Sequence, residues 1–205
     1  MVDLKRRSPL AHRDALHSSK GALRLSERPF LGKLILRLDR ERDGAAAAGV
    51  LGTELPPASP MTATAGDLTL LWLGPDEWMI VTPPGREQDI ASALEAALAG
   101  RPHQVAVVSD QFTTIELDGA RSREVLMKLS TLDLHPRAFK AGEVRGTLLA
   151  RANAILHLGA ETPEPVFGIF VRWSMADYLW CLIANAGREF GLPPQAPVDG
   201  ERLVV

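Results

Sequence analysis

The sequence has few of the residues that cross-link or activate small proteins. It contains one cysteine among 205 residues, Cys181, so it can form no internal disulfide framework and cannot hold an iron–sulfur cluster or a structural zinc. A single thiol is typical of proteins in a reducing cytoplasm. No apolar run reaches the roughly 18 residues of a membrane-spanning helix, and no apolar segment follows the basic residues near the amino terminus. We therefore expect a cytoplasmic protein with no membrane contact and no signal peptide.

The usual motifs of catalysis and nucleotide binding are also missing. No two glycines are separated by a single residue, which excludes the dinucleotide-binding fingerprint. There is no Gly-x-Ser-x-Gly nucleophile turn, and the five histidines lack the spacing of a helical zinc site. The net charge of −2 gives no general attraction to nucleic acid. We therefore expect no metal and no nucleic-acid partner, and a low chance of independent catalysis.

What the sequence does have is a strongly apolar stretch at residues 68–81, LTLLWLGPDEWMIV. Gly74, Pro75 and Asp76 predict a tight turn, because proline fixes φ while glycine and aspartate accept turn geometries. The apolar runs on either side predict two strands, buried on both faces or on one face plus a partner. The stretch is therefore predicted to be a hairpin built into the core.

Apolar periodicity predicts the other elements. We expect strands at 30–38, 105–108, 112–117, 147–158 (with a kink near Asn153) and 166–172. We expect helices at 43–51, 87–99, 118–130 and 174–190, with Asp43, Asp118 and Ser174 as the N-caps of the first, third and fourth. On the last helix the expected apolar stripe includes Tyr178 and Leu182, and Trp180 falls outside it.

The order of these elements repeats, which predicts the fold class. Strand, helix, strand, strand and helix cover 30–99, and the same order covers 112–190. We expect one α+β domain at 29–192, made of two similar β-α-β-β-α halves (about 29–104 and 105–192) that share a core, with antiparallel strand pairs covered by helices.

The two ends are expected to lie outside this domain. Residues 1–28 carry seven Lys or Arg against three Asp or Glu and show little periodicity. They are interpreted either as a disordered tail or as a basic arm that orders against a larger acidic partner. Residues 193–205 are expected to be a loop-like tail.

Candidate functional residues are few. Asp110 follows a buried-looking strand, where a desolvated carboxylate could act as a base, although a simple turn is the favoured interpretation. His135 and Arg137 flank a proline in a basic loop that could meet a carboxylate or a partner, or could be a plain solvated turn. Trp180 is expected to be exposed on its helix, as interface tryptophans are. Together with Arg28, these last three residues are our candidates for a subunit interface.

Four segments resemble the gamma subunit of heterotetrameric sarcosine oxidase. They are LWLGPDEWMIV at 71–81, RPFLGK at 28–33, DLHPRAF at 133–139 and RWSMADYLW at 172–180. The resemblance covers roughly residues 21–191. It implies a fold similar to the folate-binding domain of glycine-cleavage aminomethyltransferase, which agrees with the doubled α+β pattern.

The resemblance also implies a function that depends on partners. In that family the complex oxidatively demethylates sarcosine to glycine, with hydrogen peroxide and either formaldehyde or methylene-tetrahydrofolate as products. FAD, FMN, NAD and tetrahydrofolate are expected on the alpha and beta subunits and none on this chain, for which no catalytic residue is implied. The alternative is a stand-alone folate-dependent aminomethyltransferase-like enzyme or folate-binding protein, which would need Asp110 as a base and an aromatic-lined pocket. Whether the chain is itself an enzyme stays open.

Overall fold

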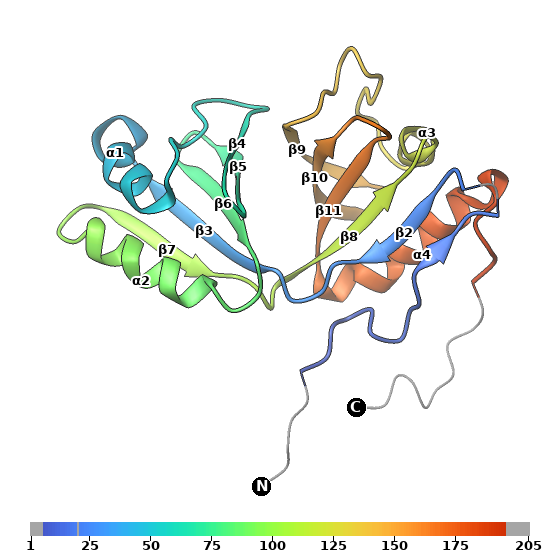
Figure 1. Ribbon diagram of the computed structural model, residues 1–205, viewed down its shortest axis with the longest axis horizontal. Helices are drawn as coiled ribbons and strands as arrows, with labels where there is room; N and C mark the ends of the chain where they lie inside the picture. Colours follow the sequence, from blue (N-terminus) through green and yellow to red (C-terminus); the bar gives the residue numbers. More distant parts are fainter. Residues whose placement is uncertain (1–5, 20, 196–205) are drawn as a thin grey trace, which may run out of the picture.

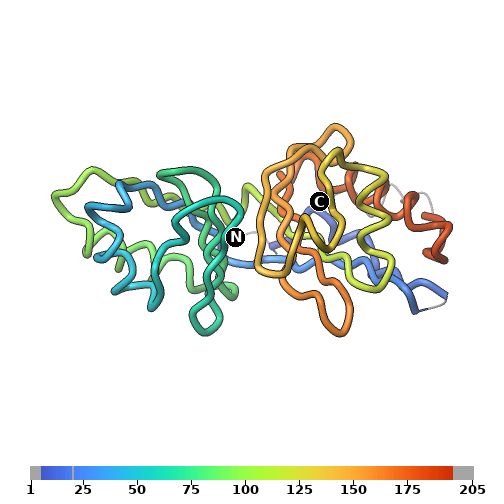
Figure 2. The backbone as a smooth tube through the Cα atoms, turned by 90° about the horizontal axis from the view of Figure 1, so that it is seen from above, coloured from blue at the N-terminus to red at the C-terminus, as the bar shows by residue number. Residues whose placement is uncertain are grey.

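Two antiparallel sheets face each other at the centre of the molecule, and helices cover their outer sides (Figure 1). The computed structural model describes residues 6–19 and 21–195. Figure 2 shows the two lobes side by side, each made of one sheet and its helices. The chain crosses between the lobes at 28–31 and again at 108–111. No helix in the described part of the chain has the length and apolar character that crossing a bilayer requires.

The first lobe has a five-stranded sheet in the order β4-β5-β6-β3-β7. Its elements are β3 (Gly32–Leu38), α1 (Arg40–Leu51), β4 (Thr62–Ala65), β5 (Leu68–Gly74), β6 (Glu77–Thr82), α2 (Glu87–Ala97) and β7 (His103–Val107). The apolar stripe of α2 buries Ile90 and Leu94 against the outer face of the sheet, as the sequence predicts.

The hairpin of β5 and β6 is confirmed, and it is buried on both faces. Its strands pair Leu70 with Ile80 and Leu71 with Met79. Leu70 and Ile80 pack towards the helices, whereas Leu71 and Met79 pack between the two sheets. The Trp78 indole N–H donates to the carbonyl of Pro56 at 2.9 Å, which satisfies its polar atom inside the core.

The second lobe has a six-stranded sheet in the order β1-β2-β8-β11-β10-β9. Its elements are β1 (Leu16–His17), β2 (Arg24–Glu27), β8 (Phe112–Asp118), α3 (Ser122–Met127), β9 (Glu143–Leu149), β10 (Ala152–Ala160), β11 (Val166–Arg172), η1 (Trp173–Met175), α4 (Ala176–Ala186) and η2 (Arg188–Phe190). The strands β9, β10, β11 and β8 occupy the places that β4, β5, β6 and β3 occupy in the first lobe. The predicted repeat is therefore present, with one extra strand (β7) at the edge of the first sheet and two (β2 and β1) at the edge of the second.

The edge strand of the second lobe comes from the amino-terminal segment. Strand β2 takes the position next to β8 that β7 takes next to β3, and it pairs Leu25 with Leu117. Leu10, Leu23 and Leu25 are buried in the core of this lobe. The expectation of an arm outside the domain is therefore wrong for the described residues of this segment. Its strands are only two and four residues long, too short to give a detectable alternation of apolar and polar residues.

Each lobe has its own helix–sheet core, and a smaller cluster joins the two sheets. The joining cluster is formed by Leu71, Met79, Val144 and Phe170. The two sheets therefore bury apolar side chains from both of their faces, which accounts for strands that are apolar without strict alternation.

The predicted N-caps of helices α1, α3 and α4 are wrong. Helix α1 is capped by Asp39, whose carboxylate accepts from the N–H groups of Glu41 and Arg42. Asp43, the predicted cap, lies inside that helix. Helix α3 follows a turn after β8, whose last residue is Asp118, and no described side chain caps it. The predicted cap Ser174 likewise lies in the turn η1.

The strand predicted at 147–158 is instead parts of two strands, β9 and β10. They form a hairpin that turns at Ala150 and Arg151, with Ala150 at φ 53°. Neither turn residue is a glycine, proline or asparagine, so the apolar pattern of 147–158 predicts one kinked strand instead of two strands and a turn.

Candidate functional site

Asp110, the candidate base, is not desolvated. It lies in the turn between β7 and β8, which is closed by the Gln111 N–H donating to the Val108 carbonyl at 3.0 Å. Its side chain is 75% exposed and accepts from the Arg6 guanidinium at 2.7 Å. An exposed carboxylate that pairs with an arginine in a turn fits the turn interpretation.

Trp180 is buried rather than exposed, so the prediction of an exposed tryptophan on this helix is wrong. It is 1% exposed and its indole N–H donates to the side chain of Gln195 at 3.0 Å. Helix α4 is apolar around most of its circumference, so two stripes of helical spacing compete. The stripe that faces the sheet contains Ala176, Leu179, Trp180, Ile183 and Ala184. Tyr178, which was assigned to the core, is exposed.

Arg28, His135 and Arg137 are exposed, but they do not form one site. Arg28 follows β2 beside Thr114, near the start of β8. His135 and Arg137 lie in the loop before β9, which joins the sheet at the opposite ends of these strands, where Gly142 donates to Leu158. Any partner that touches all three must span the length of the second sheet.

A buried arginine, which the sequence analysis did not select, holds the loop of His135 and Arg137. Arg123 on α3 is 6% exposed and donates to the carbonyls of Leu134 and Phe139. It also forms an ion pair with Glu161 and lies over the ring of Phe167. The loop that carries the family-like DLHPRAF segment is therefore held from inside the protein.

The amino-terminal segment is also fastened to the start of α4. Arg13 donates to both carboxylate oxygens of Asp177, at 2.7 and 3.1 Å, and His12 contacts the same carboxylate at 2.9 Å. Hydrogen bonding from Arg13 lowers the pKa of Asp177, although burial opposes this effect. Asp177 thus ties residues 12 and 13 to a helix more than 160 positions away along the chain.

This ion pair predicts a pH-dependent stability. Because the pKa of Asp177 is lower in the folded state, its contribution is complete above the unfolded pKa of about 3.9 and is lost as the pH falls through the folded value. We expect Asp177→Asn to lower the free energy of unfolding by about 1 kcal/mol near neutral pH, since the Asp177 side chain is about half exposed. Urea unfolding of both proteins should show the difference vanishing in acid. A difference that stays constant with pH would contradict the account.

Lys33, from the family-like segment at 28–33, sits where the chain crosses between the lobes. It is fully buried, and burial lowers its pKa to about 8. Its ammonium donates to the carbonyl of Leu31 at 2.9 Å, while its backbone bonds Val108 and Ser109 in the other crossing. A lowered pKa makes an amine more reactive, but no solvent reaches the Lys33 side chain, so a substrate could not reach it either. Its bonds connect the two crossings to each other.

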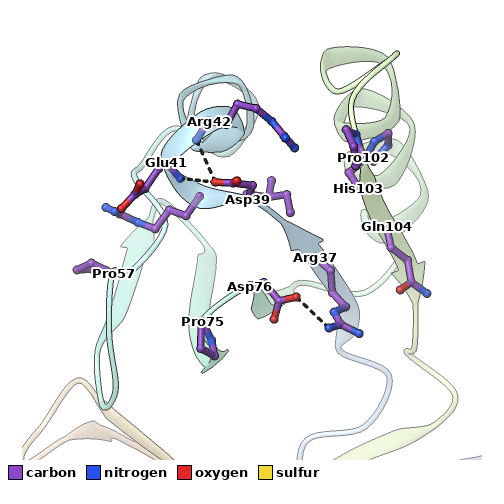
Figure 3. A pocket seen from close by; sticks show the side chains of 12 residues that line it. Arg37, Asp39, Glu41, Arg42, Pro57, Pro75, Asp76, Pro102, His103 and Gln104 are labelled. Carbon is purple, nitrogen blue, oxygen red and sulfur yellow. Dashed lines mark hydrogen bonds and ion pairs between the residues drawn. The ribbon is translucent and has the colours of Figure 1, made fainter.

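One hollow lies at the tip of the first lobe, around the start of α1 (Figure 3). It measures about 600 Å³, and the turn at Pro75 and Asp76 lies on its rim. Its charged side chains are already paired: Arg37 with Asp76 at 2.9 Å, and Arg42 with Asp43 at 2.8 Å. The carboxylate of Asp39 already occupies the helix amino terminus. This hollow has no spare cation for a phosphate or carboxylate among the residues described.

A second hollow, which we call the β9 hollow, lies on the inner face of the second sheet. It measures about 520 Å³. It is lined by Phe112, Gly146, Thr147, Leu148, Asn153, Ala154, Ile155 and Arg172. The sequence analysis selected none of these as a functional residue, because only the fold brings four different strands together here.

Neither hollow holds a constellation typical of catalysis. Among the described residues no group of three or more His, Cys, Asp or Glu side chains could hold a metal ion. Cys181 receives a hydrogen bond from Arg13, and burial raises its pKa, which disfavours the reactive thiolate.

Comparisons with known proteins agree on one family. Residues 40–189 match the model of the sarcosine oxidase, gamma subunit family. The chain is 36% identical to the sarcosine oxidase subunit gamma of Arthrobacter sp. over 196 residues, which cover 93% of this chain and 94% of that protein.

The solved structures extend this result to the fold. A chain of the heterotetrameric sarcosine oxidase from Corynebacterium sp. U-96 is similar with a TM-score of 0.82 and 31% identity, over 93% of this chain and 99% of that one. The glycine cleavage system aminomethyltransferase T from Bartonella henselae is similar with a TM-score of 0.61 and 16% identity, over 88% of this chain and 48% of that one. The second likeness confirms the predicted aminomethyltransferase-like fold. The chain belongs to the sarcosine oxidase gamma subunit family.

Proposed function

We propose that this chain is the small, non-catalytic subunit of a heterotetrameric sarcosine oxidase, in which it packs on the alpha and beta subunits. That complex would convert sarcosine to glycine and hydrogen peroxide, with formaldehyde or methylene-tetrahydrofolate as the one-carbon product. The observation that carries the proposal is the correspondence of almost the whole chain with 99% of one chain of such a heterotetramer.

We propose further that the partner subunits hold FAD, FMN, NAD and tetrahydrofolate, and that the complex works in the cytoplasm. The chemistry of this chain supports that division. The dinucleotide fingerprint is absent from the sequence, and the arginines around the hollow of Figure 3 are paired with carboxylates of the same lobe. An anionic cofactor there would have to break those pairs.

We propose that Arg28, His135 and Arg137 contact the partner subunits. All three are exposed, and the loop of the latter two is held in place by buried Arg123. A positioned loop loses little conformational entropy on binding, which favours association. The length of sheet between these residues implies a contact that extends along the second lobe.

The second candidate, a folate-binding protein, draws support from the aminomethyltransferase-like fold. It is the weaker one, because its required base, Asp110, is exposed and paired with Arg6. A fold alone does not carry a binding activity.

One experiment separates the two candidates. The full-length chain, with an affinity tag, is co-expressed with the alpha and beta subunits, and in parallel it is titrated alone with tetrahydrofolate by calorimetry. The proposal expects co-purification in equal amounts and no heat of folate binding. Folate binding by the isolated chain without co-purification would overturn it in favour of the second candidate.

A further inference from the structure

The β9 hollow is an uncovered part of an otherwise well-packed sheet face. Farther along the same face, Val144 and Phe170 are covered by the hairpin of the first lobe. At the hollow, Phe112 and Ile155 are only partly buried and Leu148 is 53% exposed. Apolar side chains therefore line an open surface near the last residues of β9 and β11, beyond the part of the sheet that the first lobe covers.

The strand that borders this hollow is an open edge. Strand β9 pairs with β10 on one side. On its other side, among the described residues, its backbone bonds the chain only at its start, where Met61 bridges Glu143 and the Val144 N–H donates to the Pro60 carbonyl. Along a strand of an antiparallel pair, the N–H and C=O groups of every second residue point away from the partner strand. The backbone groups of Gly146 and Leu148 therefore point away from β10, as those of Val144 do. No other described strand pairs with this stretch of β9.

Two exposed apolar side chains lie along this edge. Leu148 and Met61, which is 46% exposed, are the two most exposed large apolar residues described. Soluble proteins protect such edges with charges, prolines or a covering element, since an open apolar edge invites association. The edge of β9 thus has the character of a contact surface.

The charge in the β9 hollow indicates which chemical groups a bound segment must carry. Among the described residues that line the hollow, Arg172 is the charged one. Its guanidinium makes no hydrogen bond or ion pair with the described part of the chain, in contrast to the paired arginines Arg37 and Arg42 of Figure 3. An apolar floor beside an unpaired cation fits a segment that presents an apolar side chain and a carboxylate.

We propose that the β9 hollow is the docking site for a segment of the large subunit, with an apolar side chain on Phe112, Leu148 and Ile155 and a carboxylate on Arg172. The inference rests on the proposed function, since it takes its occupant from that complex. It adds a specific location on the second lobe and a specific chemistry for the bound segment.

A substitution at Gly146 tests the proposal. It lies in the hollow, and a Cβ at this position would lie more than 4 Å from every described atom that could obstruct it. Gly146→Leu should therefore fill the hollow without disturbing the fold. Gly49→Leu on α1 is the matched control, because Gly49 has equally open surroundings on the other lobe.

The affinity of each full-length variant for the purified, immobilised large subunit is measured by surface plasmon resonance at low and moderate salt. We expect Gly146→Leu to weaken binding at least 10-fold and Gly49→Leu to change it less than about twofold. Arg172→Glu, which keeps the hollow open, should also weaken binding, by about 5- to 100-fold. Thermal unfolding checks that each variant is folded.

The outcomes distinguish this inference from the function on which it rests. If the unmodified chain does not bind the large subunit, the proposed function fails together with the site. If it binds and both Gly146→Leu and Arg172→Glu bind equally well, the docking site is overturned while the proposed function stands. Loss of binding by Gly49→Leu to the same extent would also overturn the site.

Discussion

Replacing Leu25 by alanine is expected to lower the free energy of unfolding by about 2–5 kcal/mol. Leu25 is fully buried, and it lies in β2, which completes the second sheet beside β8. The substitution removes buried methyl groups and leaves a cavity among the residues of that core. Denaturant unfolding monitored by far-UV circular dichroism measures the change.

The control for this prediction lies one residue away. Arg24 is in the same strand with its side chain about half exposed, so Arg24→Ala should change stability by less than about 0.5 kcal/mol. Equal effects of the two substitutions would mean that β2 is held by its backbone alone. An unchanged Leu25→Ala protein would mean that the amino-terminal segment is a separate arm after all.

Replacing Arg123 by alanine is expected to cost about 3 kcal/mol of stability. The substitution leaves the carbonyls of Leu134 and Phe139 without their buried donor, and it removes the partner of Glu161. The loop before β9 should then lose its fixed position, which hydrogen exchange of its amides would report. Lysine should not restore stability, since one ammonium cannot reproduce the fork of a guanidinium.

Arg121 on the same lobe provides the comparison. It pairs with Glu124 at 2.7 Å, but both side chains are exposed to a large extent. Arg121→Ala should therefore cost less than about 1 kcal/mol. If the two arginines cost the same, burial is not what gives Arg123 its importance.

Strong periodicity is what made parts of this fold predictable. The hairpin at 68–81 and helix α2 stand out because their apolar residues are dense and Gly74, Pro75 and Asp76 mark the turn. The doubled order of elements is a property of the whole chain, so it survives errors at individual boundaries. The same elements set the fold class correctly.

Other parts depend on tertiary contacts that no local pattern encodes. Strand β2 is short and pairs with a strand about 90 residues away, so its few residues carry little local signal. Trp180 is buried because its face of α4 packs into the core of the second lobe, where its indole N–H donates to Gln195. Arg13, Arg123 and the β9 hollow become visible only when distant segments meet. The surfaces by which a subunit binds its partners belong to this second class.

The mass of the assembled complex tests the central claim most directly. The chain is co-expressed with the alpha and beta subunits, and the purified sarcosine-oxidising species is measured by analytical ultracentrifugation with and without this chain. The account predicts a single species that contains one copy of this 22.2 kDa chain and is smaller by that mass, or fails to assemble, when the chain is left out. An active complex of unchanged mass, with this chain sedimenting by itself, would contradict it.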